Sequence, residues 1–157
     1  YSDFCIDNEK ISSTKIRIAL QQNNLKLAAQ YLGRPYSFCG RVIRGNGIGR
    51  QWGIPTANLG LHHVVLPLRG VFVVQVQLAS RIISGVANIG RRPTLGGMKN
   101  ILEVHLFNFN EDLYGKLVHV FFLHKLRDEV KFTTVDALIE QIHRDIVEAK
   151  LFLNVTV

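Results

Sequence analysis

Acidic residues are missing from most of the first two-thirds of this 157-residue chain. No Asp or Glu occurs from Lys10 to Leu102, whereas the same stretch carries thirteen Lys and Arg. Three carboxylates precede this gap and nine follow it, so the net charge of +7 is unevenly distributed. A long basic stretch favours a polyanionic ligand, such as a nucleotide, a phosphorylated metabolite or a nucleic acid. A solvated basic surface gives the same composition, so charge alone does not choose among these.

Cysteines and long apolar runs are also scarce. The only cysteines are Cys5 and Cys39, neither at a metal-binding spacing, so no disulfide framework is indicated. This content favours a reducing compartment, and we expect a cytoplasmic protein. No apolar run approaches the roughly 20 residues of a membrane-spanning helix, and the first residues do not resemble a signal peptide. Because the chain starts at Tyr1 rather than Met, we expect it to begin within a longer protein.

Glycine is concentrated in one stretch, which holds four glycines within residues 45–53 and continues into Pro55-Thr56-Ala57-Asn58. Glycine allows a close approach of backbone to ligand, and successive N–H groups in such a loop can bind an anion. If the segment after Pro55 is extended, Thr56 and Asn58 point to the same side. Two neutral oxygen ligands beside a phosphate-binding loop suit Mg²⁺ that arrives with a nucleotide. A glycine-rich hairpin loop with a structural threonine is an equally simple interpretation.

The first carboxylate after the gap is Glu103, within the alternating apolar run 101–107. Its isolation makes it the best general-base candidate in the first two-thirds of the chain. A carboxylate on a strand more often faces solvent without a catalytic role, and that alternative stays open.

Periodicity predicts helices only at the two ends. Residues 11–32 indicate two short helices, ended by Gly33 and Pro35. Apolar residues recur at helical spacing over 135–153, and Thr133 or Thr134 is a suitable N-cap.

The segments between these helices alternate as strands do, and the lack of helices among them favours a small antiparallel barrel. Phe72, Val74, Val76 and Leu78 are expected to share one face. We expect 71–78 to pair with 81–88, and 102–107 to form a hairpin with 117–124. The predicted strands are 38–43, 71–78, 81–88, 102–107 and 117–124.

Several blocks together closely resemble the riboflavin kinase module at the C-terminus of bacterial bifunctional FAD synthetases. The resemblance covers about residues 33–153. The blocks are Gly-Asn-Gly-Ile-Gly-Arg-Gln-Trp-Gly-Ile-Pro-Thr-Ala-Asn (45–58), Gly-Val-Phe-Val-Val (70–74), Gly-Val-Ala-Asn-Ile-Gly-Arg-Arg-Pro-Thr (85–94), Leu-Glu-Val-His-Leu-Phe-Asn-Phe-Asn-Glu-Asp-Leu-Tyr-Gly (102–115) and Leu-Arg-Asp-Glu-Val-Lys-Phe (126–132).

The resemblance implies a mainly β fold: a six-stranded antiparallel Greek-key barrel with a C-terminal α-helix and short N-terminal helices. It implies transfer of the ATP γ-phosphate to the 5′-hydroxyl of riboflavin, which yields FMN and ADP, with Mg²⁺ carried by ATP. The matching positions are Glu103 as catalytic carboxylate, Thr56 and Asn58 at the metal and nucleotide, Gly45, Gly47, Gly49, Arg50 and Asn88 at ATP, and Arg127 and Glu129 near the flavin.

The segment Ile11-Ser12-Ser13-Thr14 resembles a motif near the end of the adenylyltransferase half of those enzymes. The resemblance therefore implies that residues 1–33 are a remnant of that domain with its linker and that residues 34–157 form the kinase domain. FMN adenylylation is then expected to be absent from this fragment, whose full-length form would carry an N-terminal adenylyltransferase domain as partner. We expect neither nucleic acid nor a membrane as a partner.

Two other classes of function remain possible from the residues. A basic β-barrel module that binds nucleic acid fits the charge and the strands, although aromatics are not interleaved with basic residues as a stacking platform requires. A non-catalytic flavin-binding or interaction domain would keep the fold without the chemistry. The presence of Thr56, Asn58 and Glu103 argues against the latter.

Overall fold

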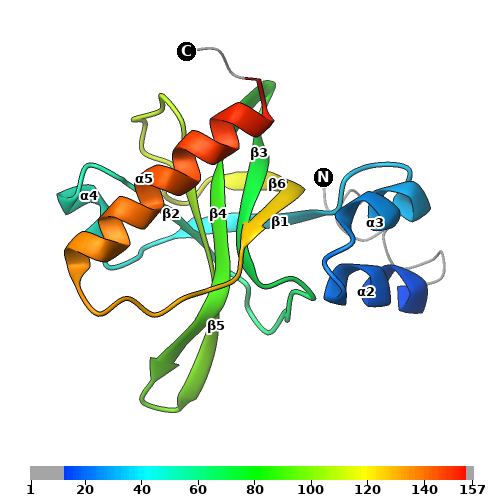
Figure 1. Cartoon of the computed structure of the whole chain (residues 1–157), viewed down its shortest axis with the longest axis horizontal. Helices are drawn as coiled ribbons and strands as arrows, with labels where there is room; N and C mark the ends of the chain where they lie inside the picture. The colour runs from blue at the N-terminus through cyan, green and yellow to red at the C-terminus, as the bar shows by residue number, and fades with distance from the viewer. Residues whose placement is uncertain (1–12, 155–157) are drawn as a thin grey trace.

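Alternating apolar residues close six strands into an antiparallel barrel in the computed structural model, which describes residues 13–154 (Figure 1). Around the barrel the strand order is β1-β2-β5-β4-β3-β6, and this confirms the predicted fold class. The strands are β1 (Ser37–Ile43), β2 (Ala57–Leu59), β3 (Gly70–Leu78), β4 (Arg81–Thr94), β5 (Gly97–Leu106) and β6 (Leu117–Arg127).

Strand β3 supplies the central part of the barrel interior, as its alternation predicts. Phe72, Val74, Val76 and Leu78 are all buried in the main apolar cluster, whereas Gln77 is exposed. The Phe72 ring packs edge-on against Phe122 of β6, with 5.6 Å between ring centroids. Buried aromatic pairs of this geometry add to the free energy gained from burying apolar surface.

The predicted hairpin between residues 102–107 and 117–124 is wrong. Strand β5 pairs with β2 and β4, and β6 pairs with β1 and β3. The hairpin partner of β5 is β4, which continues through Pro93 to Thr94 instead of ending near residue 88. Pro93 is tolerated because it lies near the tip of an exposed two-stranded arm. Residues 107–116 instead connect β5 to a strand on another part of the barrel, so neighbours in sequence do not pair.

Two short helices, α2 (Ser13–Gln21) and α3 (Leu25–Leu32), precede the barrel, as predicted for the part of 11–32 that the structure describes. The Asn24 side chain caps α3 by accepting a hydrogen bond from the Leu27 N–H, at 3.1 Å. Gly33 ends α3 with a φ of +74°, a conformation that glycine adopts without strain. Ile16, Leu20 and Ala28 belong to the same apolar cluster as the barrel interior.

Two expectations from composition have different outcomes. Cys39 lies on β1 and is disulfide-bonded, a bond that the low cysteine count did not anticipate. Because the inference of a reducing compartment rested on cysteine content, a cytoplasmic location stays a prediction. Between residues 13 and 154, no helix combines the length and apolar character needed to cross a membrane.

The C-terminal helix α5 (Val135–Phe152) lies across the outside of the barrel (Figure 1). Its N-cap is Thr134, whose hydroxyl oxygen accepts a hydrogen bond from the Ala137 N–H at 3.1 Å, as the sequence indicated. Ala149 is fully buried in a second apolar cluster with Val73 and Val86. This small residue lets the helix approach β3 and β4 closely.

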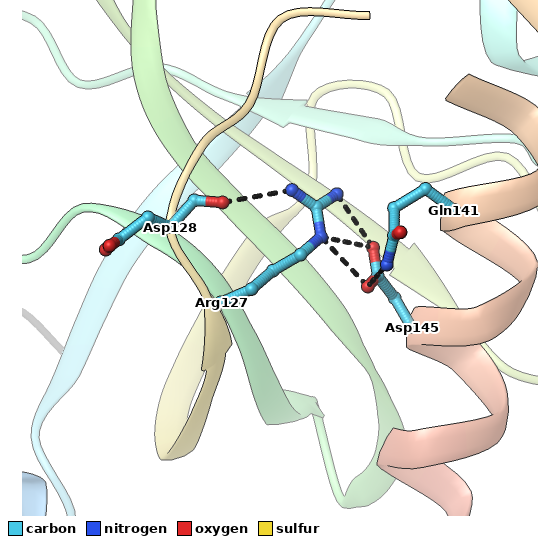
Figure 2. A network of polar contacts seen from close by, with 4 residues as sticks. All are labelled: Arg127, Asp128, Gln141 and Asp145. Atoms are coloured by element: carbon cyan, nitrogen blue, oxygen red, sulfur yellow. Dashed lines mark hydrogen bonds and ion pairs between the residues drawn. The ribbon is translucent and has the colours of Figure 1, made fainter. Parts of the chain in front are cut away.

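A buried ion pair fixes α5 to the end of β6 (Figure 2). The Nε of Arg127 donates to both carboxylate oxygens of Asp145, at 3.0 and 3.1 Å, and Nη2 donates to Oδ2 at 2.9 Å. Gln141 donates a further hydrogen bond to Oδ1 of Asp145, at 3.0 Å. Asp145 is only 2% exposed, so its charge depends on these donors.

We expect Asp145→Ala to lower the free energy of unfolding by roughly 3–5 kcal/mol, because it leaves the Arg127 guanidinium without its counter-charge. Urea denaturation followed by circular dichroism measures the change. The matched control is Glu140→Ala, which removes an exposed carboxylate paired with Arg144 on the same helix. That change is expected to cost no more than about 0.5 kcal/mol. Equal losses in the two variants would contradict the role assigned to the Arg127–Asp145 pair.

Candidate active site

Three of the predicted site residues lie side by side on adjacent strands. Asn58 of β2 is paired with Glu103 of β5, and Glu103 is paired in turn with Asn88 of β4. Side chains of directly paired residues lie on the same face of a sheet. Their neighbours along the strands, including Leu102 and Ala87, are buried in the interior. The three polar side chains therefore point outward, in one row across the outer surface of the barrel.

The polar side chains in this row differ in their hydrogen bonding. The Oε1 of Glu103 accepts a hydrogen bond from Nη2 of Arg92 at 2.8 Å, in an ion pair whose side chains are 20% and 45% exposed. The Oδ1 of Asn88 is buried and has no hydrogen-bond partner among residues 13–154. Buried acceptors are normally satisfied, so this oxygen is a candidate contact for a water or a ligand.

The glycine loop is folded against this row. It contains the short helix α4 (Ile48–Gln51), which the sequence did not indicate. A Cβ on Gly45 would lie 1.9 Å from Nδ2 of Asn58, so only glycine allows the loop to meet that amide. A Cβ on Gly49 would lie 2.3 Å from the Ile54 carbonyl oxygen, so the same kind of crowding requires glycine at position 49.

A cleft of about 700 Å³ lies between this loop and residues 109–114. Tyr114 lies on the far wall, with the Arg44 guanidinium 4.2 Å from its ring centroid. A larger cavity of about 840 Å³, between α2 and residues 65–69, contains none of the predicted site residues. The predicted residues that line the smaller cleft are Gly45, Gly47, Arg50, Thr56 and Asn58.

His105 holds the segment that carries Thr56. Its Nδ1 is 2.8 Å from the Pro55 carbonyl oxygen, so the Nδ1–H tautomer donates there. Burial lowers the pKa of His105, against the smaller opposing effect of this hydrogen bond. The imidazole is therefore neutral at neutral pH. This contact gives His105 a structural role, because it fixes the segment that leads into β2.

Arg127 and Glu129, expected near the flavin, have different surroundings. Arg127 is occupied by Asp145 and by the Asp128 carbonyl oxygen, so its contacts are those of a structural residue (Figure 2). Glu129 lies over Gly90 of β4, where an added Cβ would lie 2.1 Å from one carboxylate oxygen. Gly90 is two residues from Asn88, so Glu129 lies near the polar row. A flavin-binding role for either residue stays a prediction.

The oxygen donors in this cleft also indicate which metal ion it could hold. Thr56 and Asn58 line the same cleft and offer a hydroxyl and an amide. These neutral oxygen donors fit Mg²⁺ bound mainly by phosphates, since Mg²⁺ favours few protein ligands when a nucleotide supplies the others. In the part of the chain that is described, no group of three His, Cys, Asp or Glu is arranged to hold a metal ion.

The chain matches the family described as "Flavokinase: Riboflavin kinase" over residues 32–153. The outer row of Asn58, Glu103 and Asn88, with the glycine loop against it, thus lies within the region that defines an enzyme family. The chain belongs to this flavokinase family.

Relatives of known description extend the match. A bifunctional riboflavin kinase/FMN adenylyltransferase of Haemophilus influenzae is 51% identical over 152 residues, which are 96% of this chain and 49% of that protein. A protein of the same description from Escherichia coli K12 is 44% identical over 154 residues, 98% of this chain and 49% of its own length. This chain therefore spans about half the length of the curated relatives it matches.

Two solved structures are similar to the barrel. A protein from Streptococcus pneumoniae, described as a macrolide-efflux protein, superposes with a TM-score of 0.78 at 40% identity and covers 90% of this chain and 47% of its own. A riboflavin kinase from Trypanosoma brucei superposes with a TM-score of 0.55 at 25% identity, over 76% of this chain and 80% of that one.

The neutral state of His105 predicts a loss of stability in acid. Because its folded pKa lies below the unfolded value of about 6.5, the unfolded chain binds the proton more readily. The free energy of unfolding should therefore fall as pH drops below about 6.5. We expect His105→Asn, which cannot titrate, to fall less steeply between pH 7 and 5, whereas the exposed-residue control His63→Gln should follow the wild type. Urea titrations at each pH test this, and an unchanged slope in His105→Asn would contradict it.

Proposed function

We propose that this chain transfers the γ-phosphate of ATP to the 5′-hydroxyl of riboflavin, giving FMN and ADP. The observation that carries the proposal is the row on the barrel surface, where Glu103 lies between Asn58 and Asn88 beside the glycine loop. Membership of the flavokinase family and the related kinases described above support the choice of substrates.

The nucleotide is proposed to occupy the cleft beneath the glycine loop. Backbone N–H groups near Gly45, Gly47 and Gly49 would hold phosphate oxygens, and the Arg50 guanidinium would add a positive charge. Thr56 and Asn58 would hold Mg²⁺ that arrives with ATP. When bound, a divalent ion there would supply positive charge that stabilises the negative charge developing on the phosphates. Asn88, whose Oδ1 is an orphaned acceptor, is proposed to contact ATP from the other side of Glu103.

Glu103 is proposed to orient the acceptor hydroxyl. Its carboxylate accepts a hydrogen bond from the riboflavin 5′-OH, whose oxygen then attacks the γ-phosphorus. The bond from phosphorus to the β–γ bridging oxygen breaks, and ADP leaves with that electron pair. A loose transition state asks for little early deprotonation, so the proton passes to Glu103 late. Positioning and charge stabilisation, rather than covalent catalysis, supply most of the rate.

The flavin is proposed to lie toward Arg127 and Glu129, at the opposite side of the row from the glycine loop. Since the Arg127 guanidinium is held by Asp145, its contribution is to fix the segment that carries Glu129. Glu129 is the better candidate for a direct contact with riboflavin, because its carboxylate reaches the barrel surface at Gly90.

The chain is further proposed to be the kinase part of a bifunctional protein. Residues 1–33 would be the remnant and linker of an N-terminal adenylyltransferase domain, and residues 34–157 the kinase domain. The curated relatives are about twice as long as the matched region, which supports this division. On this proposal, the fragment makes FMN but not FAD, and it acts in the cytoplasm without nucleic-acid or membrane partners.

Product analysis tests the proposed reaction. The protein is incubated with riboflavin, ATP and Mg²⁺, and the flavins are separated by chromatography. We expect FMN without FAD, and a Glu103→Gln variant whose kcat is lower by at least about 10² because the general base is lost. Riboflavin affinity, measured by flavin fluorescence, should change little in that variant. Absence of FMN with the wild type would contradict the proposed function, and near-normal turnover of Glu103→Gln would contradict the base assignment.

Crowding at Gly45 provides a second test of the nucleotide site. Asn58→Ala should raise the Mg-ATP concentration needed for half-maximal rate, because it removes a proposed oxygen ligand. Gly45→Ala should have the same effect, since its new methyl group displaces the Asn58 amide. Gly96→Ala is the control, because its added Cβ would meet no atom within 4 Å. An unchanged Mg-ATP dependence in the first two variants would remove Asn58 from the metal and nucleotide site.

A further inference from the structure

We propose that Arg92 is a positioning residue for Glu103, an inference that rests on the proposed function. Its guanidinium holds Oε1 of the carboxylate at 2.8 Å and thereby fixes the orientation of the other oxygen, Oε2. Within residues 13–154, Oε2 accepts no hydrogen bond, so it is the oxygen left for the riboflavin hydroxyl.

The contact is possible because of how β4 and β5 are paired. Arg92 is opposite Lys99, and Glu103 is opposite Asn88, so the arginine lies four residues along β4 from the active row. Residues 88, 90 and 92 share the outward face of the strand. Gly90, between them, carries no side chain, and the Glu129 carboxylate lies over it.

The exposure of the Arg92–Glu103 pair indicates that Arg92 positions the carboxylate and contributes little to folding stability. The Arg92 side chain is 45% exposed and the Glu103 side chain 20% exposed. Ion pairs at this exposure contribute little to folding stability, because water screens them and both side chains lose freedom. A loss of activity on removing Arg92 is therefore not expected to result from unfolding. A carboxylate with a single fixed orientation is instead what in-line attack requires, since small misplacements of reacting groups cost large factors in rate.

The arm that carries Arg92 lies outside the closed barrel. Residues 91–99 of the β4–β5 hairpin are exposed, and the hairpin projects away from the body of the molecule (Figure 1). Arg92 thus connects this arm to the Glu103 carboxylate on the barrel surface. Within the described chain, the neighbouring Arg91 makes no ion pair or hydrogen bond through its side chain, and it lies on the opposite face of the strand.

The test compares Arg92→Gln with Arg91→Gln, which removes the same charge from the same arm. We expect Arg92→Gln to lower kcat for FMN formation about tenfold or more, while the KM for riboflavin and the thermal midpoint change little. Arg92→Lys should recover part of the rate, because an ammonium keeps the charge without the planar fork. Arg91→Gln should match the wild type. If the two glutamine variants behave alike, or if the loss appears only in KM, the proposal is overturned.

A double-mutant cycle then shows whether Arg92 acts through Glu103. In a Glu103→Gln background, adding Arg92→Gln should change kcat by less than about twofold, because the carboxylate to be positioned is already gone. The same tenfold loss in both backgrounds would mean that Arg92 acts independently of Glu103, and would overturn the inference. A wild-type protein that forms no FMN would instead contradict the proposed function itself, so the two failures are distinguishable.

Discussion

The hydrogen-bond register between β2, β5 and β4 is the constraint on which the rest of the site depends. It places Asn58, Glu103 and Asn88 in one row, although Asn58 and Glu103, which are directly paired, lie far apart in the sequence. A slip of one residue would turn Glu103 into the barrel interior and replace it with an apolar neighbour. The residues that fix the register are Leu59, Leu102 and Ile89, which are buried on the other face. Core packing thus determines the position of the polar groups.

The inner and outer surfaces of the barrel contribute differently to the protein. The inner face is buried and apolar, and it stabilises the fold. The outer face is divided between the polar row and the surface covered by α5, where Ala149 packs against Val73 and Val86. The Arg127–Asp145 pair links the helix-covered surface to the polar row. It fixes α5 to the last residue of β6, and the chain continues from there to Glu129. The helix therefore supports the edge of the site without contributing the proposed base.

Local signals in the sequence were sufficient for most of the individual elements, but they did not indicate α4, the short strand β2 or the extension of β4 beyond residue 88. The alternation around Phe72, the helix ended by Gly33 and the N-cap at Thr134 were all correctly predicted. The pairing of β5 was not, because strand propensity does not specify a partner and a long connection permits several. Glu103 was singled out as the first carboxylate after the acid-free stretch and Asn58 by its place after Pro55, and the resemblance then implied a role for each.

Contacts that depend on pairing between distant strands were harder to predict. The ion pair of Arg92 with Glu103 and the orphaned oxygen of Asn88 both follow from the β4–β5 register. The nearest local signal was the double arginine before Pro93, which gave no indication of which arginine faces Glu103.

The shared core of the helical pair and the barrel has a consequence for how this unit is inherited and engineered. The family match begins at residue 32, yet Ile16, Leu20 and Ala28 are buried in the same apolar cluster as Phe72. A boundary drawn from sequence families would cut through this cluster and expose its surface to water. The smallest portable unit is therefore set by packing and starts with α2, because a graft or fusion that omits the helical pair would leave part of this apolar cluster uncovered.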